Sequence, residues 1–352
     1  MSRRYAILAP GLFATRSAKT AHGVIAYAED PTVAVIDPQH AGKRICDVLP
    51  YLKSEAPIVA TLAQAREHNP DTLLVGVAAP GGALPASWRR EIVAALEGGL
   101  DVVSGLHDVL ATDPEFAAAA ARAGANIRDI RLPPDVPLFS GQAYDLKARV
   151  VLTVGTDCAV GKMTASLELV RAARARGERA VFVPTGQTGI AIAGWGISVD
   201  RTIADFTAGA AEQLVLEGST RGDLLFVEGQ GSCNHPAYAG VTISLLFGSA
   251  PDALILVHSA TRSAIEPYNT PILTYRDYIG LYEGLTASLK PARVIGIVLN
   301  TLGLSEEAAL DAIERARVQT HLPADDIVRF GCDAFYAAIA PAIGKSNKLC
   351  AS

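Results

Sequence analysis

The chain has 352 residues, of which 50% are apolar and 19% are charged, and it carries a formal net charge of -5. This length and composition predict a globular protein of about two domains. The acidic balance and the lack of a basic stripe argue against a general nucleic-acid or membrane-surface binder. No apolar run is long enough for a signal peptide or a membrane span, so we expect a cytoplasmic protein.

The first third of the chain alternates short apolar runs with helical patterns. The expected strands are residues 5–9, 32–36, 58–60, 72–77 and 101–103, and the expected helices include 88–96 and 114–123. This alternation predicts a parallel sheet with helical crossovers, a Rossmann-like architecture. Asp37 and the turn Pro80-Gly81-Gly82 are expected at the carboxyl edge of the sheet, where ligands bind. The chain has no G-x-G-x-x-G fingerprint, so a dinucleotide site here is unsupported.

A proline-rich segment without periodicity, residues 131–137, predicts a linker. We place the domain boundary near residue 145, which gives domains 1–144 and 145–352. The second domain alternates again, with expected strands at 149–154, 180–183, 224–227, 253–257 and 293–300 and expected helices ending at 176 and spanning 201–216, 275–286 and 305–318. This α/β pattern predicts a doubly wound domain of the P-loop type.

The apolar run 150–154 is followed at once by Gly155, Thr156, Asp157, Cys158, Ala159, Val160, Gly161, Lys162, Met163 and Thr164, and then by a helical pattern. This order of strand, glycine-framed loop and helix is typical of a phosphate-binding P-loop. The glycines let backbone N–H groups turn toward a phosphate, the helix dipole adds partial positive charge, and the lysine adds a full one. We therefore predict that residues 155–164 bind a phosphorylated cofactor.

The residue after Lys162 narrows the choice of ligand. Magnesium-dependent P-loop enzymes place a Ser or Thr there as a metal ligand, whereas this chain has Met163, whose soft thioether Mg²⁺ avoids. Thr164, one residue later, reaches a metal only by a shifted geometry. We predict no metal ligands in the chain and a diphosphate that binds without magnesium.

Two polar residues after the expected strand 224–227 are candidates for catalysis. Glu228 ends the strand beside a glycine turn, where P-loop proteins place an acid next to their phosphates. His235 follows in a polar loop that should overhang the same sheet edge. Either side chain could take the proton of an attacking amine, so both are predicted catalytic residues and the identity of the base stays open.

Three residues on later elements are predicted to bind ligands. Arg262 and Arg276 offer the guanidinium fork that a substrate carboxylate needs, although surface salt bridges are an alternative role. Asn300 ends the last expected strand with a donor and an acceptor suited to an adenine edge, and turn formation is its alternative role. Glycines between residues 185 and 196 predict backbone close to a ligand or a flap.

The cysteine pattern excludes two structural roles. The five cysteines, Cys46, Cys158, Cys233, Cys332 and Cys350, lie too far apart in sequence for a zinc knuckle or a disulfide framework. Cys158 and Cys233 fall inside glycine loops, close to the predicted ligand. We expect each of them to be a small packing residue in preference to a nucleophile.

Three segments together, residues 155–164, 227–236 and 258–262, resemble one family. It is a former unknown-function family that includes the DgcN-type D-glutamate N-acetyltransferases. The resemblance spans both domains and implies a Rossmann-like domain, a P-loop domain and the transfer of acetyl from acetyl-CoA to the amine of D-glutamate in D-amino-acid catabolism. It implies that the diphosphate of acetyl-CoA rests on Lys162, with Asn300 near the adenine. We expect the amine to attack the thioester directly, and transfer through Cys158 or Cys233 is a less favoured variant.

Two other functions stay open. The opening Gly155-Thr156-Asp157 also resembles dethiobiotin synthetase, which implies an ATP- and magnesium-dependent ligase or kinase that activates a carboxylate. The second alternative is a non-enzymatic nucleotide sensor. The expected partners are a small amino-acid substrate and further copies of the chain in a homo-oligomer, with no nucleic acid and no membrane.

Overall fold

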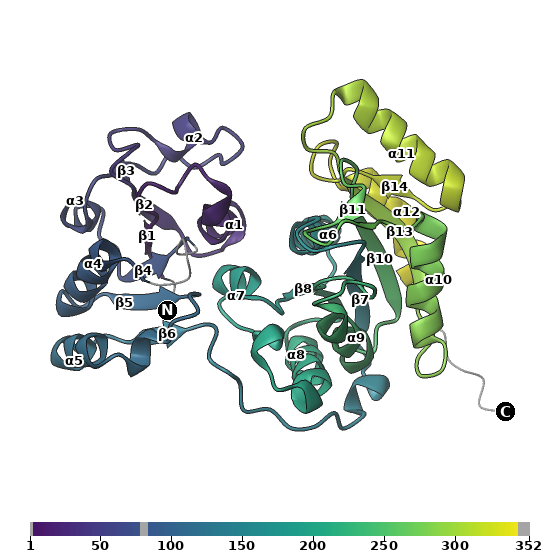
Figure 1. Cartoon of the computed structure of the whole chain (residues 1–352), viewed down its shortest axis with the longest axis horizontal. Coiled ribbons are helices and arrows are strands. Elements are labelled where there is room, and N and C mark those ends of the chain that lie inside the picture. The colour runs from purple at the N-terminus through teal and green to yellow at the C-terminus, as the bar shows by residue number, and fades with distance from the viewer. Residues whose placement is uncertain (1–2, 78–83, 344–352) are drawn as a thin grey trace. The chain divides into compact units, whose positions relative to one another are not determined.

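The computed structural model describes residues 3–77 and 84–343, so the expected turn Pro80-Gly81-Gly82 lies outside the described residues. The chain divides into two compact units, the first made of residues 1–133 with 187–201 and the second of residues 134–186 with 202–352. Each unit contains a parallel sheet between helices (Figure 1), and the α/β class predicted from the alternating pattern is confirmed. The domain boundary that the sequence places near residue 145 stays a prediction.

The sheet of the first unit has six parallel strands in the order β3-β2-β1-β4-β5-β6. The strands are β1 (Tyr5–Leu8), β2 (Thr32–Ile36), β3 (Ile58–Val59), β4 (Thr72–Val75), β5 (Asp101–Ser104) and β6 (Ile127–Asp129). This is the strand order of the Rossmann fold. Strands β1 and β4 are buried at every position, because helices cover both faces of the sheet.

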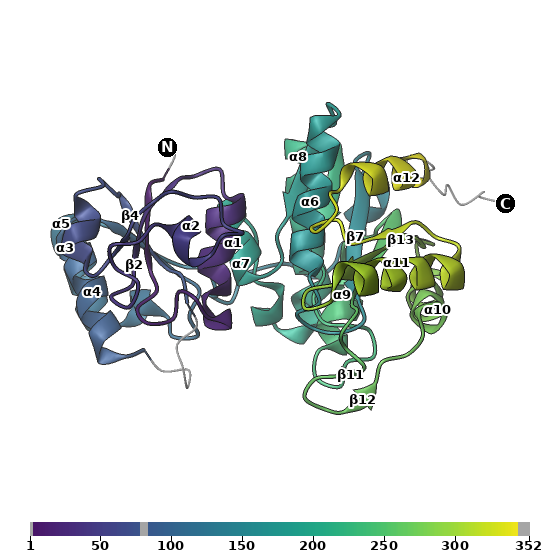
Figure 2. The same cartoon turned by 90° about the horizontal axis from the view of Figure 1, so that it is seen from above.

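The helices of the first unit form a layer on each face of this sheet. Figures 1 and 2 show α1 (Lys19–Tyr27) and α7 (Gln187–Ala193) on one face and α3 (Leu62–Arg66), α4 (Ala86–Glu97) and α5 (Pro114–Ala123) on the other, while α2 (Ile45–Val48) follows β2. Residues 187–193, expected in a glycine-rich ligand loop, instead form α7. This helix packs closely on α1, with the Thr20 and Thr188 hydroxyls 3.0 Å apart, and the closeness of this backbone to a ligand stays a prediction.

The sheet of the second unit also has six parallel strands, in the order β14-β13-β10-β7-β9-β8. The strands are β7 (Arg149–Gly155), β8 (Ala180–Val183), β9 (Leu224–Val227), β10 (Ala253–Ser259), β13 (Arg293–Asn300) and β14 (Ala324–Asp325). The chain moves to one side of β7 to form β8 and β9 and to the other side to form β10. Ligands of open α/β sheets bind at the carboxyl end of the strand where the order reverses, which is β7 here.

Helices cover both faces of this second sheet. On one face, α6 (Lys162–Ala175) packs against α12 (Asp333–Ile343), and on the other α8 (Thr207–Arg221), α9 (Ala239–Gly248) and α10 (Tyr275–Thr286) lie in a row, with α11 (Glu306–Thr320) against α10. Helix α8 was expected from residue 201. It begins six residues later, because two short 3-10 turns, Val199–Arg201 and Ala204–Phe206, precede it. The hairpin β11 (Ala264–Ile265)–β12 (Thr270–Pro271) projects from this unit (Figure 2).

A buried carboxylate fixes the start of the second unit to helix α8. The Glu212 side chain is 0% exposed, and its Oε2 and Oε1 accept the N–H groups of Ser140 (2.6 Å) and Ala143 (3.1 Å). The same segment crosses α8 at Gly209, where a Cβ would lie 1.9 Å from the Pro137 carbonyl oxygen. Only a glycine allows this close approach of the two backbones.

Replacing this carboxylate is expected to destabilise the second unit. Glu212→Ala leaves the two N–H groups buried without an acceptor and opens a cavity, which costs about 2–4 kcal/mol. Urea unfolding followed by circular dichroism measures the loss. The matched control is Glu217→Ala on the same helix, which removes an exposed pair with Arg221 and should cost under ~0.5 kcal/mol. Equal losses in the two variants would contradict the role of Glu212.

Candidate active site

The loop between β7 and α6 has the backbone geometry of an anion-binding nest. Ala159 and Gly161 adopt positive φ angles of 55° and 114°, which turn successive N–H groups toward one side of the loop. Within residues 3–77 and 84–343, the N–H groups of Ala159, Val160 and Gly161 donate to no acceptor. A nest of this kind at the start of a helix binds a phosphate or another anion.

The two residues that begin α6 are Lys162, which brings a positive charge to this loop, and Met163, which brings none. Lys162 is only 5% exposed, and its Nζ donates to the Asp157 carbonyl oxygen over 2.7 Å. Its ammonium therefore lies against the loop itself. Met163 is buried at 8% exposure, so the position that carries a metal-binding hydroxyl in magnesium-dependent P-loops carries a packed thioether here.

Helix α10 holds the first part of the loop through two tyrosines that the sequence analysis missed. Tyr278 and Tyr282, one helical turn apart, donate their hydroxyls to the carbonyl oxygens of Thr156 (2.9 Å) and Gly155 (2.7 Å). The Tyr282 oxygen also accepts the N–H of Cys233 over 3.0 Å, which ties the loop after β9 to the P-loop. The i, i+4 spacing of two aromatic residues with polar tips on an expected helix is the sequence signal for this contact.

The strand beside β7 contributes a histidine. His258, near the end of β10, places Nδ1 2.8 Å from the Thr156 hydroxyl. Burial, with a smaller contribution from the positive charge of Arg262, lowers the pKa of His258 to about 4. The imidazole is therefore neutral at physiological pH, and it fixes the Thr156 side chain at the beginning of the loop.

This lowered pKa predicts how stability depends on pH. Between pH 6.5 and 4 the unfolded chain binds a proton at His258 that the folded chain does not, so stability falls as the pH falls through this window, by at most about 1.4 kcal/mol per pH unit. We expect His258→Asn, which keeps a partner for Thr156, to reduce this slope, and the exposed control His107→Asn to leave it unchanged. Urea titrations from pH 4 to 7 measure it, and an unaltered slope in His258→Asn would contradict the assignment.

Asp157 is a fully buried carboxylate that joins the P-loop to the segment after β10. Its Oδ2 accepts the Nη1 of Arg262 (2.7 Å) and the N–H of Glu266 (3.2 Å), and its Oδ1 accepts the N–H of Cys158 (2.6 Å). Arg262 also donates to the Cys158 carbonyl oxygen and pairs with the Glu266 carboxylate. The structure thus places Arg262 at the P-loop, but the groups that its guanidinium meets belong to the protein.

Glu228 lies directly after β9, the strand next to β7, as the sequence suggested. Its Oε2 accepts the backbone N–H groups of Thr185 (3.1 Å) and Gly186 (3.2 Å), which follow β8, and its own carbonyl oxygen accepts the Thr185 hydroxyl. The next residue, Gly229, lies against β7, because a Cβ there would be 1.7 Å from the Thr153 carbonyl oxygen. These contacts fix the Glu228 carboxylate at the carboxyl edge of the sheet, beside the strand that leads into the P-loop.

His235 reaches the P-loop from the loop after β9 and is buried at 1% exposure. Its Nδ1 accepts the N–H of Ala237 over 3.1 Å, so the proton of the neutral ring is on Nε2. Nε2 lies 3.5 Å from the Asp157 Oδ1, too far for a good hydrogen bond. The rings of Tyr238 and Tyr268 pack against the imidazole. This protonation and burial do not favour His235 as a base that meets a substrate.

The structure does not bring the remaining two predicted residues to the loop. Asn300 ends β13, two strands from β7, and its Oδ1 accepts the N–H of Leu302 in a turn. Arg276, at the start of α10, donates to the Gln319 carbonyl oxygen of α11, and in the described chain no hydrogen bond or ion pair joins it to residues 155–164. The roles of Asn300 with adenine and of Arg276 with substrate stay predictions.

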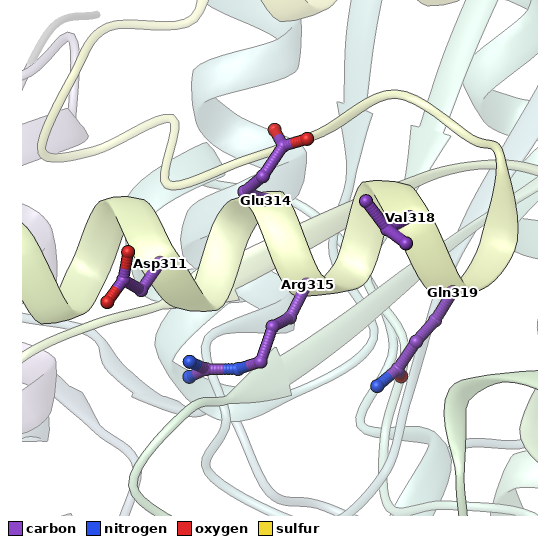
Figure 3. A pocket seen from close by; sticks show the side chains of 5 residues that line it. All are labelled: Asp311, Glu314, Arg315, Val318 and Gln319. Carbon is purple, nitrogen blue, oxygen red and sulfur yellow. The ribbon is translucent and has the colours of Figure 1, made fainter.

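The outer side of α11 carries a shallow hollow of about 310 Å³ (Figure 3). Its lining residues are all exposed and all come from this one helix: Asp311, Glu314, Arg315, Val318 and Gln319. Arg276 contacts this region through Gln319. The hollow contains none of the residues predicted for catalysis or phosphate binding.

Taken together, the strand order, the nest, the buried lysine and the acid after β9 define the second unit as a P-loop domain of an α/β protein. The chain belongs to the DUF1611 family. Residues 137–336 match the model described as a domain of unknown function (DUF1611_C) P-loop domain, and residues 38–133 match the companion Rossmann-like domain (DUF1611_N). Among the described residues, no helix has the length and apolar composition needed to span a bilayer.

Two curated relatives carry the same name. The chain is 39% identical over 285 residues to a D-glutamate N-acetyltransferase of Tritonibacter scottomollicae, which covers 80% of this chain and 84% of the relative. It is 37% identical to a D-glutamate N-acetyltransferase of a Pseudoalteromonas species, over 79% of this chain and 83% of that one. The solved structure of a DUF1611 family protein from Anabaena variabilis is 39% identical, with a TM-score of 0.89 over 97% of this chain and 100% of that chain.

Proposed function

We propose that this protein is an N-acetyltransferase that moves acetyl from acetyl-CoA to the amine of D-glutamate. The observation that carries the proposal is a P-loop with an open nest of N–H groups and a buried lysine, in which a packed Met163 replaces the metal-binding hydroxyl. Such a loop suits a diphosphate that binds without magnesium. The names of the two curated relatives support the reaction and the acceptor.

Acetyl-CoA fits this loop by its charge. Its diphosphate would accept the N–H groups of Ala159, Val160 and Gly161, and Lys162 would exchange its bond with the Asp157 carbonyl oxygen for a phosphate oxygen. The N-terminus of α6, which begins at Lys162, adds partial positive charge. Since acetyl-CoA is a cytoplasmic metabolite, the cytoplasm is the compartment that we propose.

The acceptor amine must lose a proton while it forms the amide bond. Glu228 is the base that the structure supports better than His235, because its carboxylate is held at the sheet edge by Thr185 and Gly186. D-glutamate also carries two carboxylates, which need cationic partners. The Arg262 guanidinium contacts the P-loop at Asp157, and a substrate carboxylate would have to compete there with Asp157 and Glu266.

A thiol-release assay tests the proposed function. We expect acetyl-CoA and D-glutamate to release free coenzyme A, at a rate that EDTA leaves unchanged, and L-glutamate to be a much poorer acceptor. Isothermal titration in parallel should show binding of coenzyme A without magnesium. Binding of MgATP with ADP release, and no turnover of acetyl-CoA with a panel of D- and L-amino acids, would overturn the proposal in favour of an ATP-dependent ligase or kinase.

A further inference from the structure

Three chemically reactive side chains meet at the front of the P-loop. The Cys158 Sγ, a ring nitrogen of His235 and a carboxylate oxygen of Asp157 all lie within 4.8 Å of one another. Asp157 and His235 are buried, whereas Cys158 is partly exposed and is therefore the member of the group that a ligand can reach. The thiol is part of the loop that we assign to the acyl donor.

The histidine of this group is a fixed hydrogen-bond donor. Because the Ala237 N–H occupies Nδ1, the ring proton is on Nε2, and this buried atom has no hydrogen-bond partner within the described chain. An unpaired buried N–H is costly, and it is stabilised most by an anion. The Asp157 Oδ1, 3.5 Å away, is already bonded to the Cys158 N–H, and the Cys158 thiol belongs to the same group of side chains.

The charges around Cys158 favour an anionic sulfur. Arg262 donates to the Cys158 carbonyl oxygen, and the Lys162 ammonium is bonded to the carbonyl oxygen of the preceding residue, while the start of α6 adds its dipole. Two carboxylates nearby, those of Asp157 and Glu266, oppose a negative charge on the sulfur, but both are paired with Arg262. The Tyr278 hydroxyl is neutral and is bonded to the Thr156 carbonyl oxygen. Reactive thiolates occupy partly exposed environments of this kind.

A metal ion suits the same atoms less well. A histidine that binds a metal through Nε2 carries its proton on Nδ1 and donates it to an acceptor, but here Nδ1 faces the Ala237 N–H. Two cationic side chains, Lys162 and Arg262, also lie beside the cluster and would repel a divalent cation. Both features are compatible with a thiolate that accepts the Nε2–H of His235.

We propose that Cys158 is a nucleophile that carries the acetyl group during the reaction, with His235 as the residue that holds its thiolate. This inference rests on the proposed function, and it reverses the preference for direct attack that the sequence suggested. Because the pantetheine arm is a flexible chain, the thioester can fold back to the loop that binds the diphosphate. His235 does not touch the substrate and acts as a positioning residue through the sulfur.

The reaction then proceeds in two balanced steps. In the first, the Cys158 thiolate attacks the acetyl carbonyl, the bond between this carbon and the coenzyme A sulfur breaks, and coenzyme A leaves as a thiolate that takes a proton from solvent. In the second, the amine attacks acetyl-Cys158 while Glu228 removes its proton, the C–N bond forms, and the C–S bond breaks to restore the thiolate. Glu228 returns the proton to solvent, so no other reactant is needed.

The other described cysteines lack this environment and serve as internal controls. Burial raises the pKa of Cys233, whose backbone N–H is bonded to Tyr282, and it raises the pKa of Cys332 to about 12. Cys46 lies in the first unit with an intermediate exposure like that of Cys158. Differences in reactivity among these thiols within one protein therefore report their surroundings.

Alkylation by iodoacetamide at pH 7, followed by peptide mass spectrometry, tests the thiolate without any substrate. We expect Cys158 to react at least ~10-fold faster than Cys46. His235→Gln, which keeps an N–H donor, should retain most of this rate, and His235→Leu should lose it about 5- to 10-fold. Reaction of Cys158 at or below the rate of Cys46, or an increase when EDTA is added, would overturn the proposal, the latter in favour of a bound metal.

Trapping the acyl group tests the nucleophile directly. Acetyl-CoA alone, quenched with acid, should leave an acetyl group on Cys158 that D-glutamate then discharges, and Cys158→Ala should still bind coenzyme A but lose at least ~100-fold in transfer. No adduct, together with retained transfer by Cys158→Ala, would overturn the covalent route. If the wild type shows no transfer at all, the proposed function fails, and the alkylation rates still decide whether Cys158 is a thiolate.

Discussion

Lys162→Ala is expected to weaken the binding of coenzyme A about 10- to 100-fold. A charge-assisted hydrogen bond between an ammonium and a phosphate contributes about 1.5–3 kcal/mol, and each 1.4 kcal/mol is a factor of ten in affinity. The lysine is buried against the loop at 5% exposure and is bonded to the Asp157 carbonyl oxygen, so its removal takes a full positive charge from the loop. Isothermal titration of coenzyme A and the KM for acetyl-CoA measure the loss.

Two controls separate this effect from a general loss of charge or of fold. Lys147→Ala removes an exposed lysine of the same unit and should bind coenzyme A as the wild type does. Adding Mg²⁺ should change neither affinity, because Met163 offers no hard ligand. Unchanged affinity in Lys162→Ala, with the fold intact by circular dichroism, would show that the diphosphate binds elsewhere.

The strands and the helix that position this site could be predicted, because their apolar runs and helical periodicity match the structure that they form. The bounds of β8, β9, β13 and α10 match those expected from apolar runs and helical periodicity, since buried parallel strands leave little choice of residue. The P-loop was recognisable because its backbone geometry demands glycine at fixed spacing. Glu228 followed from the same logic, as an acid at the end of a strand adjacent to β7.

The contacts that decide chemistry could not be predicted, because they join residues far apart in the sequence. Nothing local indicates that Arg262 pairs with Asp157, or that the Tyr282 hydroxyl accepts the N–H of Cys233. Helix α7 has small residues and glycines that suit either a loop or a close helix contact, and only its packing on α1 selects the helix. Sequence reasoning therefore located the P-loop and left the assignment of its acid and base open.

Asp157→Asn is expected to destabilise the second unit by about 2–4 kcal/mol. The substitution keeps the size of the side chain but leaves the Arg262 guanidinium, only 17% exposed, without its buried anionic partner. The same change weakens the contact with the Glu266 N–H, so the segment after β10 loses its attachment to the P-loop. Urea unfolding gives the free energy, and susceptibility of residues 262–272 to proteolysis reports the local release.

A double-mutant cycle decides whether this loss belongs to the ion pair. Because each single variant removes the buried partner of the other charge, Asp157→Asn combined with Arg262→Gln should cost at least ~1 kcal/mol less than the sum of the single substitutions. The exposed pair of Arg221 and Glu217 on α8 is the matched control and should show a coupling below ~0.5 kcal/mol. If the Asp157 and Arg262 effects add, the carboxylate acts through the Cys158 and Glu266 N–H groups alone. Arg262 would then keep its guanidinium available for the carboxylate of a substrate, and the KM for D-glutamate of Arg262→Gln would rise accordingly.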